Sequence, residues 1–306
     1  MVKADSTRRG AAPAGIMRRR FLTGAAASLV LPSIGAAEVP APLGPRVAVL
    51  ARWMVETVLA LGVTPVAIPE LSRNPVWRGL GLQGSIDLGL IGEPNLELLD
   101  QLRLDYIFIE AGFQSARWTP ILGEIAPVVV GSIYNRSLAP LNAARVESRR
   151  FGELLTVEDR ADALLADTAA ALETAAAMPL ARTPPVFVVR LLDDRNVILF
   201  CGGSIFDDVL KAVGIRNACS LSSMWGFLSN GIEALAAVPD AHLIYFDPVP
   251  PEARVLFDKP SLWSHLPAVK AGRVTAIPEL YSWGALPTAR LFAEILVERL
   301  TPGRRG

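Results

Sequence analysis

The chain has 306 residues, of which 51% are hydrophobic and 20% charged, with 30 basic and 30 acidic residues. This balance is typical of a globular protein and excludes an intrinsically disordered chain. With only two cysteines and two histidines, the chain lacks the ligands from which proteins usually build transition-metal sites, so we expect no resident metal.

The N-terminal segment resembles an export signal. Arg18 and Arg19 form an arginine pair, Phe21 and Leu22 follow, and an apolar run and small residues extend to Ala37. A charged region, a short apolar stretch and a small-residue ending predict a secretory signal over residues 1–37, and the arginine pair favours the twin-arginine route. The apolar stretch is shorter than the ~20 residues of a membrane-spanning helix. We therefore expect a soluble periplasmic protein.

Removal of this leader changes the charge of the protein. It takes away six of the 30 basic residues and one of the 30 acidic residues, which leaves 24 against 29 and a net charge of about −5. Nucleic-acid-binding proteins concentrate positive charge, so this balance argues against nucleic acid as a partner.

After the leader, apolar segments alternate between strand and helix patterns. Residues 46–50 predict a strand, 53–62 a helix closed by a glycine, 63–68 a second strand, 93–102 a helix and 104–112 a buried strand. Strands that alternate with helices predict βα units and a largely parallel sheet. The pattern returns at 204–220 and 231–247, which indicates a second lobe of related build.

A long helical stretch separates these two halves. It runs through residue 155, and Thr156 is a candidate N-cap for the Ala- and Leu-rich helix that follows. The predicted fold is α/β, with two Rossmann-like lobes joined by one long backbone helix. The predicted boundaries are 38–137 for the N-terminal lobe, 138–183 for the helical connector and 184–306 for the C-terminal lobe. Ligands of open α/β sheets bind at the carboxyl ends of strands, so we expect a cleft between the lobes.

Cys201 and Cys219 are the two cysteines of the chain. An oxidising compartment permits them to form a disulfide, whereas two buried thiols fit the same sequence. The sequence leaves both states open.

Seven segments resemble a known family: VETVLALGVTPVAI, GLIGEPNLELL, EAGF, GGSIFDDVL, MWGF, VKAGRV and YSWGA. They are similar to the siderophore-binding proteins of ABC iron importers, in particular the ferric hydroxamate (ferrichrome-type) binding proteins of the helical-backbone (class III) periplasmic binding proteins. The resemblance extends over nearly the whole chain after the leader. It implies a monomer that carries a ferric siderophore as ligand, holds no intrinsic cofactor and meets an inner-membrane ABC permease.

The resemblance also implies a cleft with aromatic walls. Trp77, Trp225 and Tyr281 fall where the family has pocket aromatics, and Trp283 stands beside them. Rigid rings give a large contact area at low entropic cost, which suits chelates of varied shape. Ordinary core packing is the alternative for each ring.

Three positions depart from the family pattern. Ile91 aligns with the family's chelate-binding arginine, Phe113 with its tyrosine and Ile109 with a tryptophan. Phe113 stays in the expected ligand-binding set, but the first-lobe floor of the cleft becomes more apolar. The siderophore itself therefore remains open.

Another cation is expected to replace the missing arginine. Arg190 lies in the otherwise apolar segment PVFVVRLLDD, and a planar guanidinium can hold two chelate oxygens at once. The alternative for Arg190 is a salt bridge to Asp193 or Asp194. Arg52 and Arg117 are weaker candidates.

Three acidic residues are candidates for docking to the permease. The resemblance implies one acid on each lobe, and Glu233 matches the position in the second lobe. In the first lobe the alignment fails near the segment FQSARWTP, so Glu93 and Glu124 are candidates that the resemblance does not assign. A solvated surface acid is the alternative for each.

The sequence contains no G-x-S-x-G elbow, Walker loop or H-E-x-x-H motif, so we expect no enzyme. Two alternatives remain: a haem- or cobalamin-binding protein of the same class, in which Tyr281 or a histidine serves haem as axial ligand, and an exported redox or hydrolytic enzyme.

Overall fold

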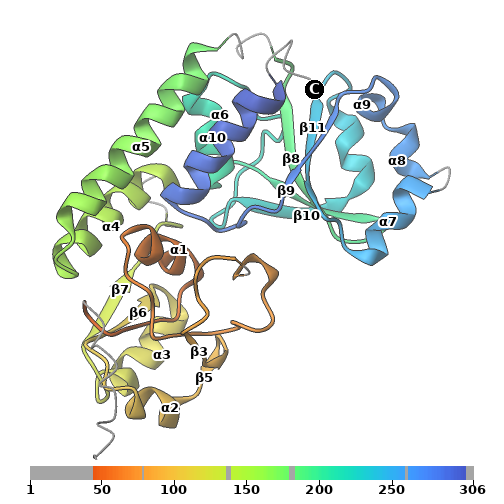
Figure 1. The fold of residues 1–306 in the computed structure, drawn as a ribbon. Helices are drawn as coiled ribbons and strands as arrows, with labels where there is room; N and C mark the ends of the chain where they lie inside the picture. Colours follow the sequence, from red (N-terminus) through yellow and green to blue (C-terminus); the bar gives the residue numbers. More distant parts are fainter. Residues whose placement is uncertain (1–43, 78, 136–138, 179–182, 259–260, 301–306) are drawn as a thin grey trace, which may run out of the picture. The chain divides into compact units, whose positions relative to one another are not determined.

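The computed structural model describes residues 44–77, 79–135, 139–178, 183–258 and 261–300. The predicted signal peptide lies outside these residues. Within them the chain forms two five-stranded sheets and the helices that pack on them (Figure 1). The predicted α/β class is confirmed.

The first sheet is entirely parallel, with strand order β3-β2-β1-β6-β7. A short antiparallel pair, β4 and β5, follows β3. The elements are β1 (Val47–Val49), α1 (Arg52–Ala60), β2 (Ala67–Ile68), η1 (Pro75–Trp77), β3 (Ile86–Asp87), β4 (Gly89–Leu90), β5 (Glu93–Pro94), α2 (Leu96–Gln101), β6 (Tyr106–Glu110), α3 (Phe113–Leu122) and β7 (Val128–Gly131).

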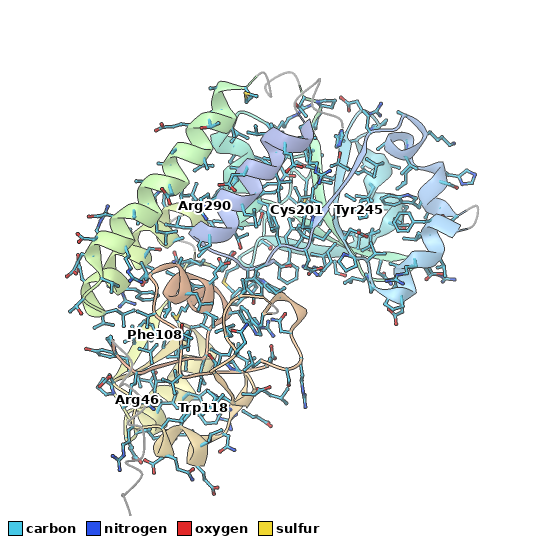
Figure 2. All side chains as sticks on the ribbon, in the orientation of Figure 1. Arg46, Phe108, Trp118, Cys201, Tyr245 and Arg290 are labelled. Atoms are coloured by element: carbon cyan, nitrogen blue, oxygen red, sulfur yellow. A yellow bond between two sulfur atoms is a disulfide. The ribbon has the colours of Figure 1, made fainter. Side chains whose placement is uncertain are left out.

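Side chains of β6 alternate between the two faces of this sheet. Phe108 packs against Phe151, whereas Ile107 and Ile109 belong to the core that contains Trp118. Figure 2 labels Phe108 and Trp118, which mark these two cores. Because the side-chain period of a strand is two, Glu110 shares the face of Phe108.

The helix predicted over 93–102 begins later than expected. Glu93 and Pro94 pair with β4 instead, and Asn95 is the N-cap, where its Oδ1 accepts a hydrogen bond from the backbone N–H of Leu98 at 3.0 Å. Local side-chain capping therefore places the helix start at Leu96.

The connector contains two helices, α4 (Pro140–Leu154) and α5 (Glu158–Ala177). The prediction that Thr156 caps the second helix is wrong, because Thr156 has a positive φ of 55° and Val157 is the N-cap residue. Helix α5 packs along α10 (Leu286–Leu300), as Figure 1 shows.

The second sheet is mixed, with strand order β10-β9-β8-β11-β12. Strands β8, β11 and β12 are parallel, whereas β9 and β10 are antiparallel to their neighbours. Its elements are β8 (Val186–Leu191), β9 (Asn196–Phe200), α6 (Ile205–Ala212), β10 (Phe227–Gly231), η3 (Ile232–Ala237), β11 (His242–Asp247), α7 (Pro251–Asp258), α8 (Leu262–His265), α9 (Pro267–Lys270) and β12 (Val274–Pro278).

The predicted repeat holds only in part. Helix α6 and strand β11 lie where the repeat places them, but the strand expected near 215–218 is a single bridge between Asn217 and Val186. The segment expected as an amphipathic helix after Gly231 is the 3₁₀ helix η3. The antiparallel strands β10 and β9, which α6 separates along the chain, form one side of the second sheet instead, with β10 at its edge.

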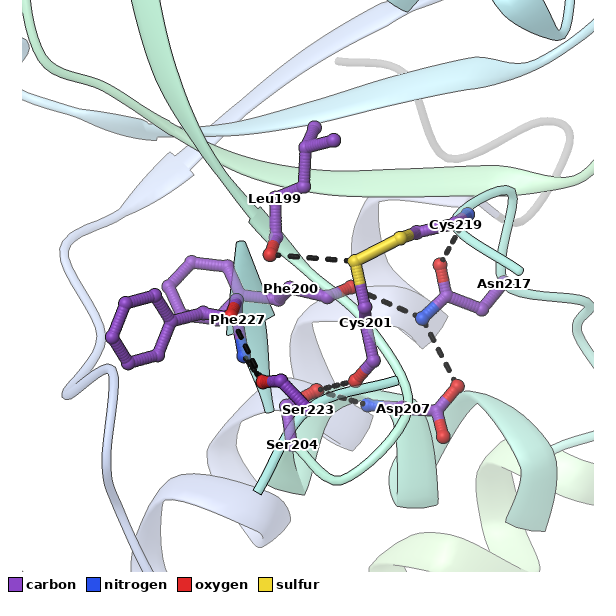
Figure 3. The surroundings of a disulfide bond; sticks show 9 residues. All are labelled: Leu199, Phe200, Cys201, Ser204, Asp207, Asn217, Cys219, Ser223 and Phe227. Carbon is purple, nitrogen blue, oxygen red and sulfur yellow. Dashed lines mark hydrogen bonds between the residues drawn. A yellow bond between two sulfur atoms is a disulfide. The ribbon is translucent and has the colours of Figure 1, made fainter. Parts of the chain in front are cut away.

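A disulfide joins Cys201 to Cys219, which resolves the alternative left open by the sequence (Figure 3). It links the residue after β9 to the loop after α6. Around it, Ser204 caps α6 by accepting from the N–H of Asp207 at 3.1 Å, and Asn217 donates to the Asp207 carboxylate at 3.0 Å. The loop after α6 is therefore fastened to the end of β9 by the disulfide.

One hydrophobic core includes residues of the first sheet, the connector and the second sheet. Its largest members include Phe108, Phe151, Phe206 and Phe292. No helix in the described part of the chain is long and apolar enough to cross a bilayer.

Candidate functional site

Two neighbouring cavities lie at the carboxyl ends of strands from both sheets. The first encloses about 330 Å³ and the second about 270 Å³. Arg52 and Trp283 line both, so we treat the two as one cleft. The first is lined by Ala51, Arg52, Trp53, Ile91, Glu110, Tyr134, Trp225, Phe227 and Trp283, and the second by Arg52, Asn74, Arg190, Ile198, Glu279, Tyr281, Ser282 and Trp283.

Five of the nine residues that line the first cavity are aromatic. Trp283 meets Phe227 edge-on at 5.5 Å between ring centroids and lies 6.3 Å from Tyr281. Trp225 is 43% exposed and has no ring contact within the described residues. A ligand in the first cavity therefore has a free indole face available for stacking.

Tyr281 and Trp77 form a second layer of this wall. Their rings stack at 5.6 Å with an interplanar angle of 27°, and both are buried. Trp77 is not among the residues that line either cavity, so the structure places it behind Tyr281. Burial raises the pKa of Tyr281 well above its usual value, against the opposing effect of Arg52, so its hydroxyl stays protonated.

Residue 284 must be a glycine because it lies against the first turn of α10, where a larger side chain would meet Thr288. A Cβ at this position would lie 2.1 Å from Oγ1 of Thr288. The Tyr134 hydroxyl donates to the carbonyl of Gly284 at 2.9 Å. The aromatic segment is thereby fixed against the residues that follow β7.

The two arginines of the cleft each hold a carboxylate of the protein. Arg52 pairs with Glu70 at 2.5 Å and lies over the Trp283 ring at 5.9 Å. Arg190 pairs with Glu279 and donates to Oγ of Ser282 at 2.9 Å. Both guanidiniums face the cleft, but each is already neutralised.

The alternative salt bridges considered for Arg190 do not form. Asp193 instead closes the β8–β9 turn by accepting from the backbone N–H groups of Arg195 and Asn196. Asp194 lines a separate groove described below. The sequence did not identify Glu279 as the partner, although it opens the aromatic segment, because its distance from Arg190 along the chain is 89 residues.

Glu110 is a cleft residue that the sequence analysis missed. It ends β6, and its Oε2 accepts a hydrogen bond from the indole N–H of Trp53. Burial raises the pKa of Glu110 to about 7, although the bond from Trp53 and the nearby Ser132 hydroxyl favour the ionised form. An acid at the end of an apolar strand was the signal available in the sequence.

The remaining predicted first-lobe residues lie in different places. Ile91 lines the first cavity, whereas Ile109 is buried in the core on the opposite face of the sheet. Arg117 is exposed on α3 and lies over the Trp118 ring at 4.7 Å, and it is not among the lining residues. The side chain of Phe113 lies outside the described ones.

The predicted docking acids are all at the surface. Glu93 in β5, Glu124 after α3 and Glu233 at the start of η3 are exposed. Glu233 lines a surface groove of about 880 Å³ together with Asp194 and Arg195. This groove is distinct from the cleft, since the two share no lining residue.

Comparisons with known proteins give one consistent answer. A family model described as periplasmic binding protein matches residues 47–281. The iron(3+)-hydroxamate-binding protein FhuD of Escherichia coli K12 is 30% identical over 286 residues, which cover 92% of this chain and 95% of that protein.

Solved structures share the fold. The siderophore-binding protein FhuD from Vibrio cholerae, determined with bound Fe³⁺-Desferal, matches with a TM-score of 0.75 and 29% identity over 84% of this chain and 97% of that chain. Staphylococcus aureus SirA complexed with staphyloferrin B matches with a TM-score of 0.62 and 19% identity, over 84% of this chain and 93% of that one. The second likeness concerns the fold alone.

Proposed function

The chain belongs to the periplasmic binding protein family, and from this premise we propose that it captures a ferric siderophore in the cleft and delivers it to an ABC importer. The observation that carries the proposal is the aromatic cleft at the strand ends, with Trp225, Phe227 and Trp283 around one cavity and Tyr281 beside the next. The named ligands of FhuD relatives, iron(3+)-hydroxamate and Fe³⁺-Desferal, favour the hydroxamate class. The bound iron is cargo, held by the siderophore.

Haem binding is the weaker alternative. A tyrosinate axial ligand requires a deprotonated hydroxyl, whereas the Tyr281 ring is buried against Trp77 and its pKa is raised. We therefore favour a wrapped iron complex that needs no ligand atom from the protein.

Tryptophan fluorescence tests the proposal. Ferric hydroxamate, citrate-based hydroxamate and catecholate complexes are titrated into the full chain, with the iron-free siderophores as controls. We expect saturable quenching by a ferric hydroxamate, and a smaller quench with weaker affinity in Trp225→Ala, because Trp225 is the exposed ring of the first cavity. No quenching by any of the three classes, or a Soret band after exposure to haem, overturns the proposal.

Delivery requires a docking surface apart from the cleft. We propose that Glu233 meets a cation of the permease, since an exposed acid complements such a group without disturbing the ligand. Glu233→Ala should leave siderophore affinity unchanged and reduce uptake into cells. Glu252→Ala, an exposed acid on α7 of the same lobe, is the matched control. Unchanged uptake in Glu233→Ala removes this residue from docking, and Glu93 and Glu124 are then tested in the same way.

The proposed compartment is the periplasm, reached by the twin-arginine route. The Cys201–Cys219 disulfide supports an oxidising compartment. Replacement of Arg18 and Arg19 by lysine should block export in a cell-fractionation assay. Export of this variant at the parental level would contradict the route. We expect a monomer that binds one siderophore, which a sedimentation experiment with ligand checks.

A further inference from the structure

The first cavity contains a carboxylate that the aromatic wall does not explain. Glu110 lies among Trp53, Ile91, Trp225 and Phe227, so the surface around it is largely apolar. Its Oε2 accepts from Trp53, whereas Oε1 is shielded from solvent and has no hydrogen-bond partner of regular geometry in the described structure. An ionised carboxylate has about four acceptor sites, so Glu110 can accept further bonds even where the Ser132 hydroxyl beside it is counted with Trp53.

The charged side chains that line the cleft differ in whether each has a partner of opposite charge. Arg52 is held by Glu70 and Arg190 by Glu279, which leaves Glu110 as the lining carboxylate without a cation among the described residues. The groups on α4 do not change this. Arg150 pairs with Glu147 at 2.8 Å, and Glu147 itself opposes the ionisation of Glu110.

We propose that Glu110 selects ferric siderophores whose arm in the first cavity carries a protonated amine or another N–H donor. This inference rests on the proposed function and names the ligand class of the same site. A donor from the ligand would bond the carboxylate on the side where Glu110 lines the cavity, and an ammonium would also neutralise its charge. Charge-assisted bonds of this kind are stronger than those between neutral groups.

The second cavity is suited to a different part of the ligand. There the Arg190 guanidinium lines the cavity, and a chelate oxygen can bind it by sharing it with Glu279 and Ser282, to which it already donates. The two cavities share Arg52 and Trp283. A ferric trihydroxamate with one free arm thus fits an orientation in which the chelate faces Arg190 and the arm reaches Glu110.

The test compares two ligands that differ in a single group. A linear ferric trihydroxamate with a free terminal amine and the same chelate with the amine acetylated are titrated by calorimetry at pH 8, where Glu110 is ionised. The wild-type protein should bind the free amine at least about tenfold more tightly, which corresponds to one charged hydrogen bond. Glu110→Gln, which still accepts from Trp53, should reduce this ratio to about one.

Two controls separate selection from structural support. If Glu110 serves only to orient Trp53, both chelates lose affinity equally in Glu110→Ala and the wild-type protein shows no preference, which overturns the inference. Glu279→Gln removes an acid of the second cavity and should keep the preference. If Glu279→Gln loses the preference and Glu110→Gln keeps it, the amine binds in the second cavity, which overturns the inference.

The outcomes also distinguish this inference from the proposed function. Equal binding of both chelates to the wild-type protein overturns the selectivity and leaves siderophore binding in place. Binding of neither chelate, with no other ferric hydroxamate bound, overturns both. Because the wild-type comparison needs no substitution, the result does not depend on the folding of a variant.

Discussion

The two cleft arginines show how neighbouring side chains decide what a cation can do. Arg190 was expected to donate freely to a chelate, but it already donates to Glu279, Ser282 and the carbonyl of Leu280. A ligand must therefore share or displace a carboxylate to obtain the guanidinium. The pair is only about one quarter exposed, so this competition takes place where salt screens weakly.

Substitutions on either side of this pair should have opposite effects on siderophore affinity. Arg190→Ala removes the donor and should weaken binding by roughly 2 kcal/mol, whereas Arg190→Lys should recover only part of the loss. Glu279→Gln releases the guanidinium and should strengthen binding of a ferric hydroxamate severalfold. Calorimetric titration measures all three variants, with Glu70→Gln as the matched change at the Arg52 pair. Parental affinity in both Arg190→Ala and Glu279→Gln would show that the chelate oxygens lie elsewhere.

Glu110 should give the free protein a titration near neutral pH. Its pKa is raised from 4.5 to about 7, mainly by burial. The native state therefore binds more protons than the unfolded state between these values, and the free energy of unfolding should fall as pH rises from about 4.5 to about 7. Arg52 and Tyr134 line the same cavity, and Ser132 and Glu147 lie beside the carboxylate.

The indole N–H of Trp53 is the reporter of this titration. Its proton resonance should move upfield as pH falls through about 7, because protonation weakens the bond that Glu110 accepts. Glu110→Gln should abolish the step and reduce the slope of unfolding free energy with pH. A Trp53 resonance that does not change between pH 5 and 9 would show that Glu110 is not titrating in this range.

At the scale of elements, two helices, α4 and α10, receive carboxylates from other helices at their N-termini. Ala139, the N-cap residue of α4, has no capping side chain, and Asp208 of α6 accepts from the N–H of Leu141 at 2.9 Å. Glu56 of α1 accepts from the N–H of Ala285 and from Oγ1 of Thr288 at the start of α10. Each cap supplies an acceptor at a helix N-terminus and fastens two elements together, although burial raises the pKa of Glu56 to about 7.

Glu56 should therefore contribute to global stability. Glu56→Ala leaves the Ala285 N–H and the Thr288 hydroxyl without their acceptor and should lower the free energy of unfolding by roughly 2 kcal/mol. Glu56→Gln keeps one acceptor and should cost less. Urea unfolding checks both, and Glu97→Ala on the exposed face of α2 is the control, with a change within about 0.5 kcal/mol. Equal stability of Glu56→Ala and Glu97→Ala would contradict the capping role.

The same elements show what the sequence can and cannot predict. Apolar period and glycine stops identified β1, α1 and β6, because these signals are local. The pairing of Arg190 with Glu279 spans 89 residues and that of Glu56 with Ala285 spans 229, so no local pattern contains them. The Thr156 prediction failed for a related reason: the connector's path between α4 and α5 places that residue at positive φ. The resemblance named Trp225, Tyr281 and Trp283, but it did not single out Tyr134 or Phe227, and Glu110 had only the local signal of an acid at the end of an apolar strand.

At the scale of the whole molecule, the cleft is built on a continuous core. Residues of α1, α4, α5, α6 and α10 belong to one hydrophobic cluster, which contains Met54, Phe151, Leu172, Phe206 and Phe292. Glu56 and Tyr134 add polar bonds from first-lobe elements to the segment that carries Trp283. Opening by a large hinge rotation would have to break both the packing and these bonds.

We therefore expect the protein to change shape very little when it binds its ligand. Interdomain motion is expected where an interface is small and polar, whereas here residues of both sheets belong to one hydrophobic cluster. Small-angle scattering of the full chain should give the same radius of gyration, within error, with and without a saturating ferric hydroxamate. Glu56→Ala is the variant to compare with the wild type. It removes the bonds between α1 and the start of α10 and should increase motion between the lobes, whereas Glu56 does not line the cleft. A clear decrease in the radius of gyration of the wild-type protein on binding would show that the lobes close by hinge motion, and the core described above would then have to separate in the free state.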